Sequence, residues 1–319
     1  MEKLRYGILS TSSIAPRMIA ALRHSGAGEA VALSSRSIDK AREYSALWDI
    51  PVAYGDHMQL LEDPNVEIVY ISTVNAMHYP WAKAALERGK HVLCEKPCTT
   101  NATQTAELFA LAKEKGLFFM EAEKMLFLPA ILEVKRCLDA GNLGKITMVT
   151  MSHSFAASYN TWMYDASAGG GPLLSSGIYA VELLIWLFGG VRDVHGVASF
   201  HESGVEQQYV ITGKAGDDIL FIIKNSTVSA LDNRAVIYGS KGFVEIPEYW
   251  KARKAVFHLN GGLDTVEFPC EHELTYEAQH VSDCISRGEI TSPVVTPELS
   301  TAAIRVLEEI GAQWKKEKA

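Results

Sequence analysis

A lysine stands at a place where a folded chain could use it for proton transfer. Lys96 lies in the run Glu95-Lys96-Pro97, directly after the apolar segment His91–Cys94, which we expect to be a buried strand. Open α/β sheets bind ligands at the carboxyl ends of their strands, so Lys96 is predicted to face a ligand. Pro97 restricts the backbone of the residue before it, which limits the directions in which the ammonium can point. The alternative is a lysine in an ordinary surface loop.

A tyrosine is the predicted partner of this lysine. Tyr179 follows Gly169-Gly170-Gly171 at the start of an apolar helical pattern. A phenol near a lysine cation has its ionised form favoured, so the two side chains can act as one acid–base unit. Hydride transfer from an alcohol needs a group that takes the hydroxyl proton, and the reverse reaction needs a group that supplies it. We predict that Lys96 and Tyr179 are catalytic; a core tyrosine is the alternative for Tyr179.

A hydroxyl-rich turn could hold phosphate groups. The strand pattern Leu4–Ser10 leads into Ser10–Pro16, where a dinucleotide-binding fold places its glycine-rich turn and a helix N-terminus. The first two usual glycines are serines here, and Ala15 fills the third position. The alternative is that Ser12 or Ser13 only caps the helix. The predicted cofactor contacts in this turn are Ser10, Thr11, Ser12 and Ile14.

The end of the second predicted strand, Ala30–Ser35, indicates which dinucleotide is bound. A site for NAD usually has a carboxylate here for the ribose 2′-hydroxyl, and none is present. The guanidinium of Arg36 can instead pair with the 2′-phosphate of NADP. We predict NADP(H) rather than NAD(H), with Ser35 and Arg36 as contacts; a solvated surface arginine is the alternative.

The elements that position these residues form two blocks. The first block alternates β-branched runs with amphipathic segments, which predicts βαβ units and a parallel sheet over residues 1–122, a Rossmann domain. Residues 123–319 contain a helix at Ala130–Ala140, a series of strands with turn signals, and two late helices. This pattern predicts an α+β domain with a large, predominantly antiparallel sheet that binds substrate and suits a homodimer. The predicted strands of the two blocks are Leu4–Ser10, Ala30–Ser35, Val52–Tyr54, Glu67–Ser72, His91–Cys94 and Leu117–Glu121, then Lys145–Phe155, Val194–Phe200, Gln207–Thr212, Ile219–Asn225, Arg234–Tyr238 and Phe243–Ile246.

Several segments resemble one family throughout the chain. Thr73–His78 contains N-x-x-H, Gly89–Pro97 reads GKHVLCEKP, and Gly169–Tyr179 is similar to a GGGxLxDxGxY helix start. These segments strongly resemble the Gfo/Idh/MocA oxidoreductases, including a dihydrodiol dehydrogenase-like branch that also lacks the fingerprint glycines. The resemblance implies a nicotinamide cofactor and the same Lys96–Tyr179 pair. The expected cofactor contacts also include Thr73, Asn75, His78, Glu95 and Lys96.

Two departures from the family pattern bear on the substrate. The family's aspartate in GGGxLxDxG is Ser175 here, and the arginine of many linkers is Leu126. We expect Ser175 near the substrate, and Asp165 as an acceptor for a substrate hydroxyl; an aspartate that caps a helix start or lies in a loop is the alternative for Asp165.

The composition excludes several partner classes. The 319-residue chain is 48% hydrophobic, enough for the cores of about two domains. A net charge of −8 disfavours nucleic acid and anionic membranes as partners. We expect no signal peptide, because the first residues run straight into a strand pattern, and the apolar run Ala180–Val191 is too short to span a bilayer. The five cysteines are scattered, which indicates a reducing, cytoplasmic location.

No metal site is predicted, because Cys94 and Cys98 lack a second pair and the spacing Glu277-x-x-His280 occurs once.

Three functions compete at this point. The leading one is an oxidoreductase acting on a secondary alcohol or ketone of a small polyhydroxylated substrate: a sugar, an inositol or a cyclic diol. The second is a sensor that binds NADP without turnover, as the change to Ser175 would allow. The third is an NAD-retaining glycosidase, which oxidises its substrate transiently. Net redox turnover separates the first from the other two.

Overall fold

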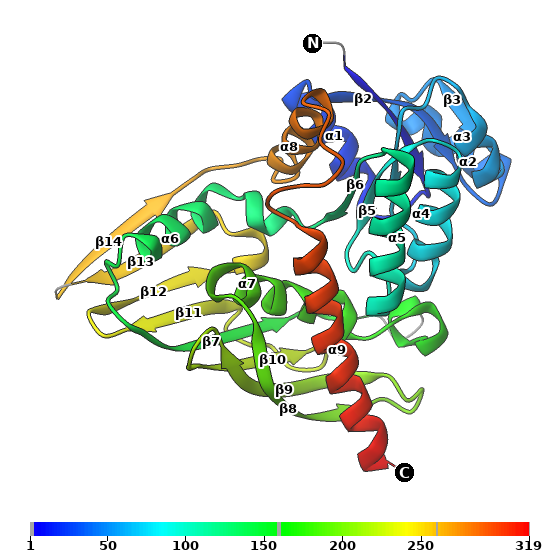
Figure 1. Cartoon of the computed structure of the whole chain (residues 1–319). Helices are drawn as coiled ribbons and strands as arrows, with labels where there is room; N and C mark the ends of the chain where they lie inside the picture. The colour runs from blue at the N-terminus through cyan, green and yellow to red at the C-terminus, as the bar shows by residue number, and fades with distance from the viewer. Residues whose placement is uncertain (1–2, 158–160, 260, 319) are drawn as a thin grey trace. The chain divides into compact units, whose positions relative to one another are not determined.

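The computed structural model describes residues 3–157, 161–259 and 261–318. Met1 and Glu2, at the predicted leaderless start, lie outside the described residues. The chain divides into two compact units (Figure 1). Unit 1 is Met1–Glu123 with Glu271–Ser300, and unit 2 is Lys124–Cys270 with Thr301–Ala319.

Unit 1 is built on a six-stranded parallel sheet, which confirms the predicted Rossmann fold. Its strand order is β3-β2-β1-β4-β5-β6. All four residues of β4, Ile-Val-Tyr-Ile, are buried because helices cover both faces of such a sheet. The order reverses between β1 and β4, so the carboxyl ends of these two strands flank the crevice where open sheets bind ligands. The strands are β1 (Leu4–Leu9), β2 (Gly28–Ser34), β3 (Val52–Tyr54), β4 (Ile68–Ile71), β5 (His91–Glu95) and β6 (Phe119–Ala122).

Capping residues set the helices of unit 1. Helix α5 begins after Asn101, whose side chain accepts from the Gln104 N–H at 2.9 Å, and ends at Gly116 in the left-handed conformation. The sequence predicted amphipathic segments between the strands, and these form the four longer helices. It missed α3, whose six residues are too few for a recognisable period. The helices are α1 (Ala15–Ser25), α2 (Ile38–Trp48), α3 (His57–Glu62), α4 (His78–Glu87) and α5 (Ala102–Lys115).

A late helix also belongs to unit 1. Helix α8 (Thr275–Ser286) lies beside α1, as Figure 1 shows, and buries Ala278, Val281 and Cys284. The following segment pairs with the sheet edge, since the Phe119 N–H donates to the Ile290 carbonyl at 3.1 Å. The sequence had placed this helix in a second domain running without interruption over 123–319. That assignment was wrong for 271–300, because periodicity along the chain does not show which core an apolar helix face joins.

Unit 2 contains an eight-stranded sheet in the order β14-β13-β12-β11-β7-β10-β9-β8. Its neighbours are antiparallel except for β7 and β10, which confirms the predicted sheet type. The sequence missed β13 and β14; β14 is a largely exposed edge strand without a buried apolar face to reveal it. The strands are β7 (Ile146–Ser154), β8 (Val191–Phe200), β9 (Glu206–Ala215), β10 (Ile219–Ser226), β11 (Arg234–Gly239), β12 (Gly242–Pro247), β13 (Lys254–Leu259) and β14 (Gly262–Glu267).

Helices α6 (Pro129–Asp139) and α7 (Ile178–Phe188) pack in unit 2, and α9 (Pro297–Lys318) belongs to unit 2 from Thr301 onward. Helix α9 is held to β8 by the Trp314 indole N–H, which donates to the Gly196 carbonyl at 2.8 Å. The stretch Ala166–Phe188 is long and apolar enough to cross a membrane, but 67% of its most apolar window is buried inside the structure. Packing in the core therefore accounts for its apolar character.

The other face of the unit 2 sheet carries exposed apolar side chains. Val197 on β8 and Val210 on β9 are cross-strand partners, 66% and 41% exposed, and Leu220 on β10 is 47% exposed. Exposed apolar patches of this kind often mark protein–protein contacts. This face is therefore a candidate surface for the predicted homodimer.

We expect the wild-type protein to have a solution mass of two chains rather than one chain of 35.0 kDa. Val197→Lys combined with Val210→Lys should dissociate the dimer, because burying each valine contributes about 1.5–3 kcal/mol. Light scattering after size exclusion measures the mass. Leu47→Lys, at a 70% exposed site of unit 1, is the control and should leave the mass unchanged. A wild-type mass of one chain would remove the dimer.

Candidate active site

The turn after β1 is shaped to admit a phosphate. Ser10 has φ 104°, a conformation that favours glycine, and its N–H donates to the Ser34 carbonyl of β2 at 3.1 Å. The Ser12 hydroxyl donates to the Ser72 hydroxyl after β4 at 2.8 Å. This bond ties the two sides of the strand-order reversal together. Serine therefore takes the backbone conformation of the usual glycine at position 10.

The N-terminus of α1 has no capping side chain. Ile14 is its N-cap residue, in a helical conformation, and no side chain bonds the first N–H groups. The alternative in which Ser12 or Ser13 caps the helix is therefore wrong. The positive end of the helix dipole favours an anion such as a pyrophosphate at this place, while the Ala15 and Arg17 N–H groups donate to the Ser12 and Ile14 carbonyls and Pro16 has no N–H. The residues present fit this part of a dinucleotide.

A hollow of about 450 Å³ lies at the carboxyl ends of β1, β2 and β3. The exposed side chains of Arg36 and Lys40 line it. Helix α2 begins at the same place, after its N-cap residue Ser37. This arrangement is a cationic site fitting a ribose phosphate. It brings together the predicted Ser10, Thr11, Ser35 and Arg36 with Ser37, Lys40 and His57.

Sequence analysis missed His57 and Lys40. His57 is buried, and its Nδ1 lies 2.8 Å from the Ser34 hydroxyl. Burial lowers the pKa of His57, Asp56 partly offsets this, and Arg36 adds a smaller decrease. The feature that could have identified His57 is its position after β3, because β3 ends at the same sheet edge as β2.

Thr73, Asn75 and His78 follow β4, on the other side of the reversal. Asn75 is buried in a short 3₁₀ turn, Asn75–Met77. His78 is also buried, with Nδ1 2.7 Å from the Pro97 carbonyl oxygen and Nε2 3.1 Å from that of Thr73. The imidazole therefore joins two main-chain segments, and we expect it to affect the cofactor through them.

Lys96 follows β5 directly, at the predicted edge of the sheet, and its peptide bond to Pro97 is cis. Glu95 accepts from the Tyr70 hydroxyl at 2.5 Å, which holds the end of β5 against β4. Lys90, at the start of the same motif, is structural: its ammonium donates to the Asp63 and Val66 carbonyls at 2.7 and 2.8 Å. Burial lowers the pKa of Lys90.

The predicted residues of unit 2 surround the start of α7. Tyr179 lies in its first turn and is 8% exposed. A π-helical turn, Leu173–Gly177, precedes it, and such turns occur frequently at functional sites. Glu206 of β9 accepts from the Leu173 N–H at 2.8 Å. A side chain on Gly177 would meet the Tyr209 hydroxyl at 2.5 Å, so this position requires glycine.

The two predicted substrate contacts have local roles. The Ser175 hydroxyl donates to the Gly171 carbonyl at 2.7 Å, within its own turn. Asp165 is exposed and caps the turn Ala166–Ala168, accepting from the Ser167 N–H and hydroxyl at 2.8 and 2.6 Å. The Ser167 hydroxyl, then its N–H, lower the pKa of Asp165. The capping role that sequence analysis left open for Asp165 is therefore present, and its substrate role stays a prediction.

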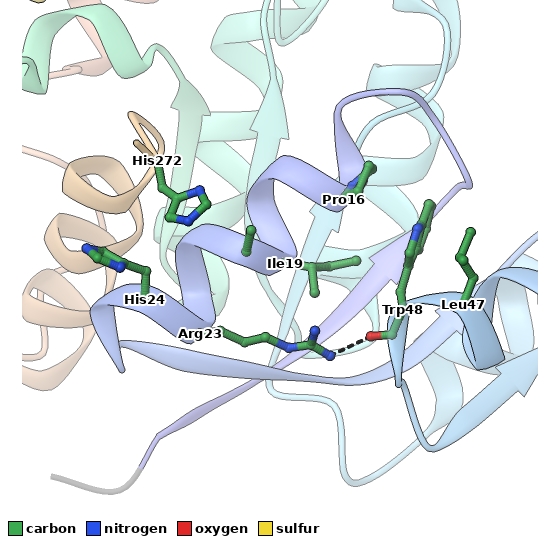
Figure 2. A pocket seen from close by; sticks show the side chains of 8 residues that line it. Pro16, Ile19, Arg23, His24, Leu47, Trp48 and His272 are labelled. Atoms are coloured by element: carbon green, nitrogen blue, oxygen red, sulfur yellow. Dashed lines mark hydrogen bonds between the residues drawn. The ribbon is translucent and has the colours of Figure 1, made fainter. Parts of the chain in front are cut away.

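A second hollow, about 430 Å³, lies on the outer side of α1 (Figure 2). Ile19 and His24 of α1 line it with Trp48 at the end of α2 and His272. The Arg23 guanidinium donates to the Trp48 carbonyl at 2.5 Å and so is held at its rim. None of the predicted site residues lines this hollow. The part of the chain that the structure describes also holds no group of three or more histidines, cysteines or acids able to bind a metal.

Comparison with known proteins supports the resemblance seen in the sequence. Residues 4–123 match the family model "Oxidoreductase family, NAD-binding Rossmann fold", and residues 131–245 match "GFO/IDH/MocA C-terminal domain". The chain belongs to the Gfo/Idh/MocA oxidoreductase family. This member is 32% identical to a trans-1,2-dihydrobenzene-1,2-diol dehydrogenase of Mus musculus, over 99% of both chains. The Homo sapiens protein of the same name is 31% identical over 96% of each chain.

Solved structures also match this Gfo/Idh/MocA chain. An aldose-aldose oxidoreductase from Caulobacter crescentus, complexed with glycerol, is 25% identical with a TM-score of 0.90 and covers 99% of this chain and 98% of its own. A levoglucosan dehydrogenase in complex with NADH and levoglucosan, 18% identical, shares the fold with a TM-score of 0.90 over 99% and 98%. A 3-ketoreductase from Actinomadura kijaniata in complex with NADP, 24% identical, has a TM-score of 0.88 over 98% of each chain.

Ser10→Gly should stabilise the protein by about 0.5–1 kcal/mol. The left-handed region costs a residue with a side chain about 1–2 kcal/mol, and the greater freedom of glycine in the unfolded chain offsets part of the gain. Urea unfolding measures the difference. Ser13→Gly, in the same turn but outside the positive-φ positions, is the matched control and should be neutral or destabilising. Equal effects of the two variants would contradict the idea that Ser10 is strained.

Proposed function

We propose that this protein is an NADP(H)-dependent oxidoreductase. It transfers a hydride between the nicotinamide and a secondary alcohol or ketone of a sugar, an inositol or a cyclic diol. The observation that carries the cofactor preference is the cationic hollow, where Arg36 and Lys40 stand beside the N-terminus of α2. Neighbours bind either NADP or NADH, so this local chemistry supports the choice of NADP.

The chemistry of the protein itself is proton transfer. When bound, the nicotinamide supplies or accepts the hydride. In the oxidation, the substrate carbinol loses its hydroxyl proton to the Tyr179 phenol oxygen, and the Lys96 ammonium stabilises the ionised phenol. The reverse path returns the proton to the ketone oxygen. Relatives named for a dihydrodiol dehydrogenase and for aldose oxidation support a small substrate with a secondary hydroxyl.

Turnover separates this proposal from its alternatives. We expect purified protein with NADP⁺ and a panel of cyclic diols and polyols to give a net increase in absorbance at the band of the reduced nicotinamide. Cofactor binding without turnover would indicate a sensor. Substrate cleavage without net redox change would indicate a glycosidase.

Arg36→Asp should weaken NADP binding by about 2–3 kcal/mol, because it removes a charge-assisted hydrogen bond and adds repulsion. NAD affinity should change little, since NAD carries no 2′-phosphate. Titration by nicotinamide fluorescence measures both constants. Arg42→Asp, an exposed site on α2 with the same change of charge, is the control and should keep the NADP preference. Wild-type protein that binds NAD as tightly as NADP would defeat this part of the proposal.

Lys96→Met should lower kcat by roughly 10²–10⁴ while the cofactor still binds, because it removes the charge and keeps the length of the side chain. Tyr179→Phe should lose a similar factor, and the double variant little more than either single one if the two act as a unit. Steady-state rates at saturating cofactor test this. Lys113→Met, exposed on α5, is the control. Near-normal turnover of Lys96→Met would exclude the proposed role.

A further inference from the structure

One peptide group beside Lys96 is held from both sides by buried side chains. The group joins Pro97 to Cys98, so its carbonyl oxygen is that of Pro97 and its N–H is that of Cys98. The carbonyl lies 2.7 Å from His78 Nδ1, and the N–H donates to Glu121 Oε1 at 2.8 Å. The segment that carries the proposed catalytic lysine therefore has a fixed point one residue downstream.

His78 supplies the donor of this pair. A carbonyl oxygen only accepts, so the close contact requires the ring proton on Nδ1. Burial lowers the pKa of His78, and the hydrogen bond to Pro97 offsets this decrease in part. Both ring nitrogens lie within hydrogen-bond distance of a carbonyl oxygen, and the contact of Nδ1 with Pro97 is the shorter of the two. His78 thus anchors the Pro97 carbonyl to the start of α4.

Glu121, on the neighbouring strand β6, supplies the acceptor for the Cys98 N–H. It lies on β6 and is paired in register with Cys94 of β5. Its side chain is fully buried, and its Oε2 has no hydrogen-bond partner among the residues that the structure describes. Burying a carboxyl group with one oxygen unbonded is costly, and a methionine would fill the same volume without that cost. The bond to the Cys98 N–H is the observed interaction that offsets it.

We propose that Glu121 is a positioning residue for catalysis: together with His78 it clamps the Pro97–Cys98 peptide and so fixes the direction of the Lys96 side chain. The inference rests on the proposed function, in which Lys96 handles a proton. Glu121 acts through the turn and not on the substrate. Its loss should therefore lower kcat more than it raises KM for the cofactor.

Two substitutions separate the hydrogen bond from the packing. Glu121→Gln keeps an oxygen that can accept from the Cys98 N–H, whereas Glu121→Met removes the acceptor at similar length. Met120→Ala is the control: it is buried on the same strand, but consecutive strand residues point to opposite faces. If Glu121→Met does not fold, Glu121→Asp takes its place in the experiment, because the shorter side chain withdraws the acceptor by one methylene.

Hydrogen exchange of the full-length protein, measured on peptides that contain Cys98, reports the clamp without any need for activity. We expect Glu121→Met to speed exchange there by about 5- to 30-fold, the factor for losing one to two kcal/mol locally. Glu121→Gln should remain near wild type. Equal protection in Glu121→Met and wild type, or equal loss in Met120→Ala, would overturn the clamp.

Kinetics then test the consequence for Lys96. We expect kcat of Glu121→Met to fall by about 10- to 100-fold with little change in KM for NADP, and Glu121→Gln to recover most of it. The pH dependence of kcat should shift in Glu121→Met and not in Met120→Ala, because only the first moves Lys96. A normal kcat and pH profile beside a loosened Cys98 peptide would refute the positioning role. Inactive wild-type protein would refute the proposed function and, with it, any role of Glu121 in catalysis, whereas exchange would still decide the clamp.

Discussion

The parallel pairing of β1 with both β2 and β4 is the constraint on which the cofactor half of the site depends. Parallel strands all end at the same edge of a sheet, so residues distant in sequence meet there. Ser10, Arg36 and Thr73 are separated by tens of residues, yet each lies within two residues of the end of one of three adjacent strands. The Ser12–Ser72 bond crosses the reversal of strand order and ties its two sides. A change of register would separate these side chains even if every helix survived.

Much of this arrangement could be predicted from the sequence, because the hydrophobic periodicity and the helix-capping residues indicate the same elements. The run Ile68–Ile71 is apolar on both faces, and Asn101 and Gly116 mark the two ends of α5, so the strand–helix order was predictable. The motif around Lys96 placed the lysine at the correct edge. His57 was not predicted as a site residue, because its helix has only six residues and because its place in the site depends on a neighbouring strand. Local sequence does not show which strand lies next to which.

The same reasoning explains the errors in the second half. Helix α8 has an ordinary amphipathic pattern, and its apolar face could have joined either core; packing on α1 decides, and only tertiary structure shows it. Asp165 shows the converse case. An aspartate followed two residues later by serine is a common cap, and the structure has that cap. Sequence patterns describe the role of a polar residue best when its partners are local.

Three strained or costly features of unit 1 lie near the predicted ligand edge. Ser10 takes a left-handed conformation, the first turn of α1 lacks a capping side chain, and Glu121 buries a carboxyl group with one unbonded oxygen. Each lowers stability relative to a simple alternative: a glycine, a capping serine or a methionine. Folds retain such costs where the backbone must present donors or hold a side chain in one direction. Lys90, in contrast, donates from its ammonium to two main-chain carbonyls and belongs to the scaffold. The partners of Lys90 therefore assign it to the scaffold, whereas the position of Lys96 at the carboxyl end of a buried strand is the feature from which we predict its role in proton transfer.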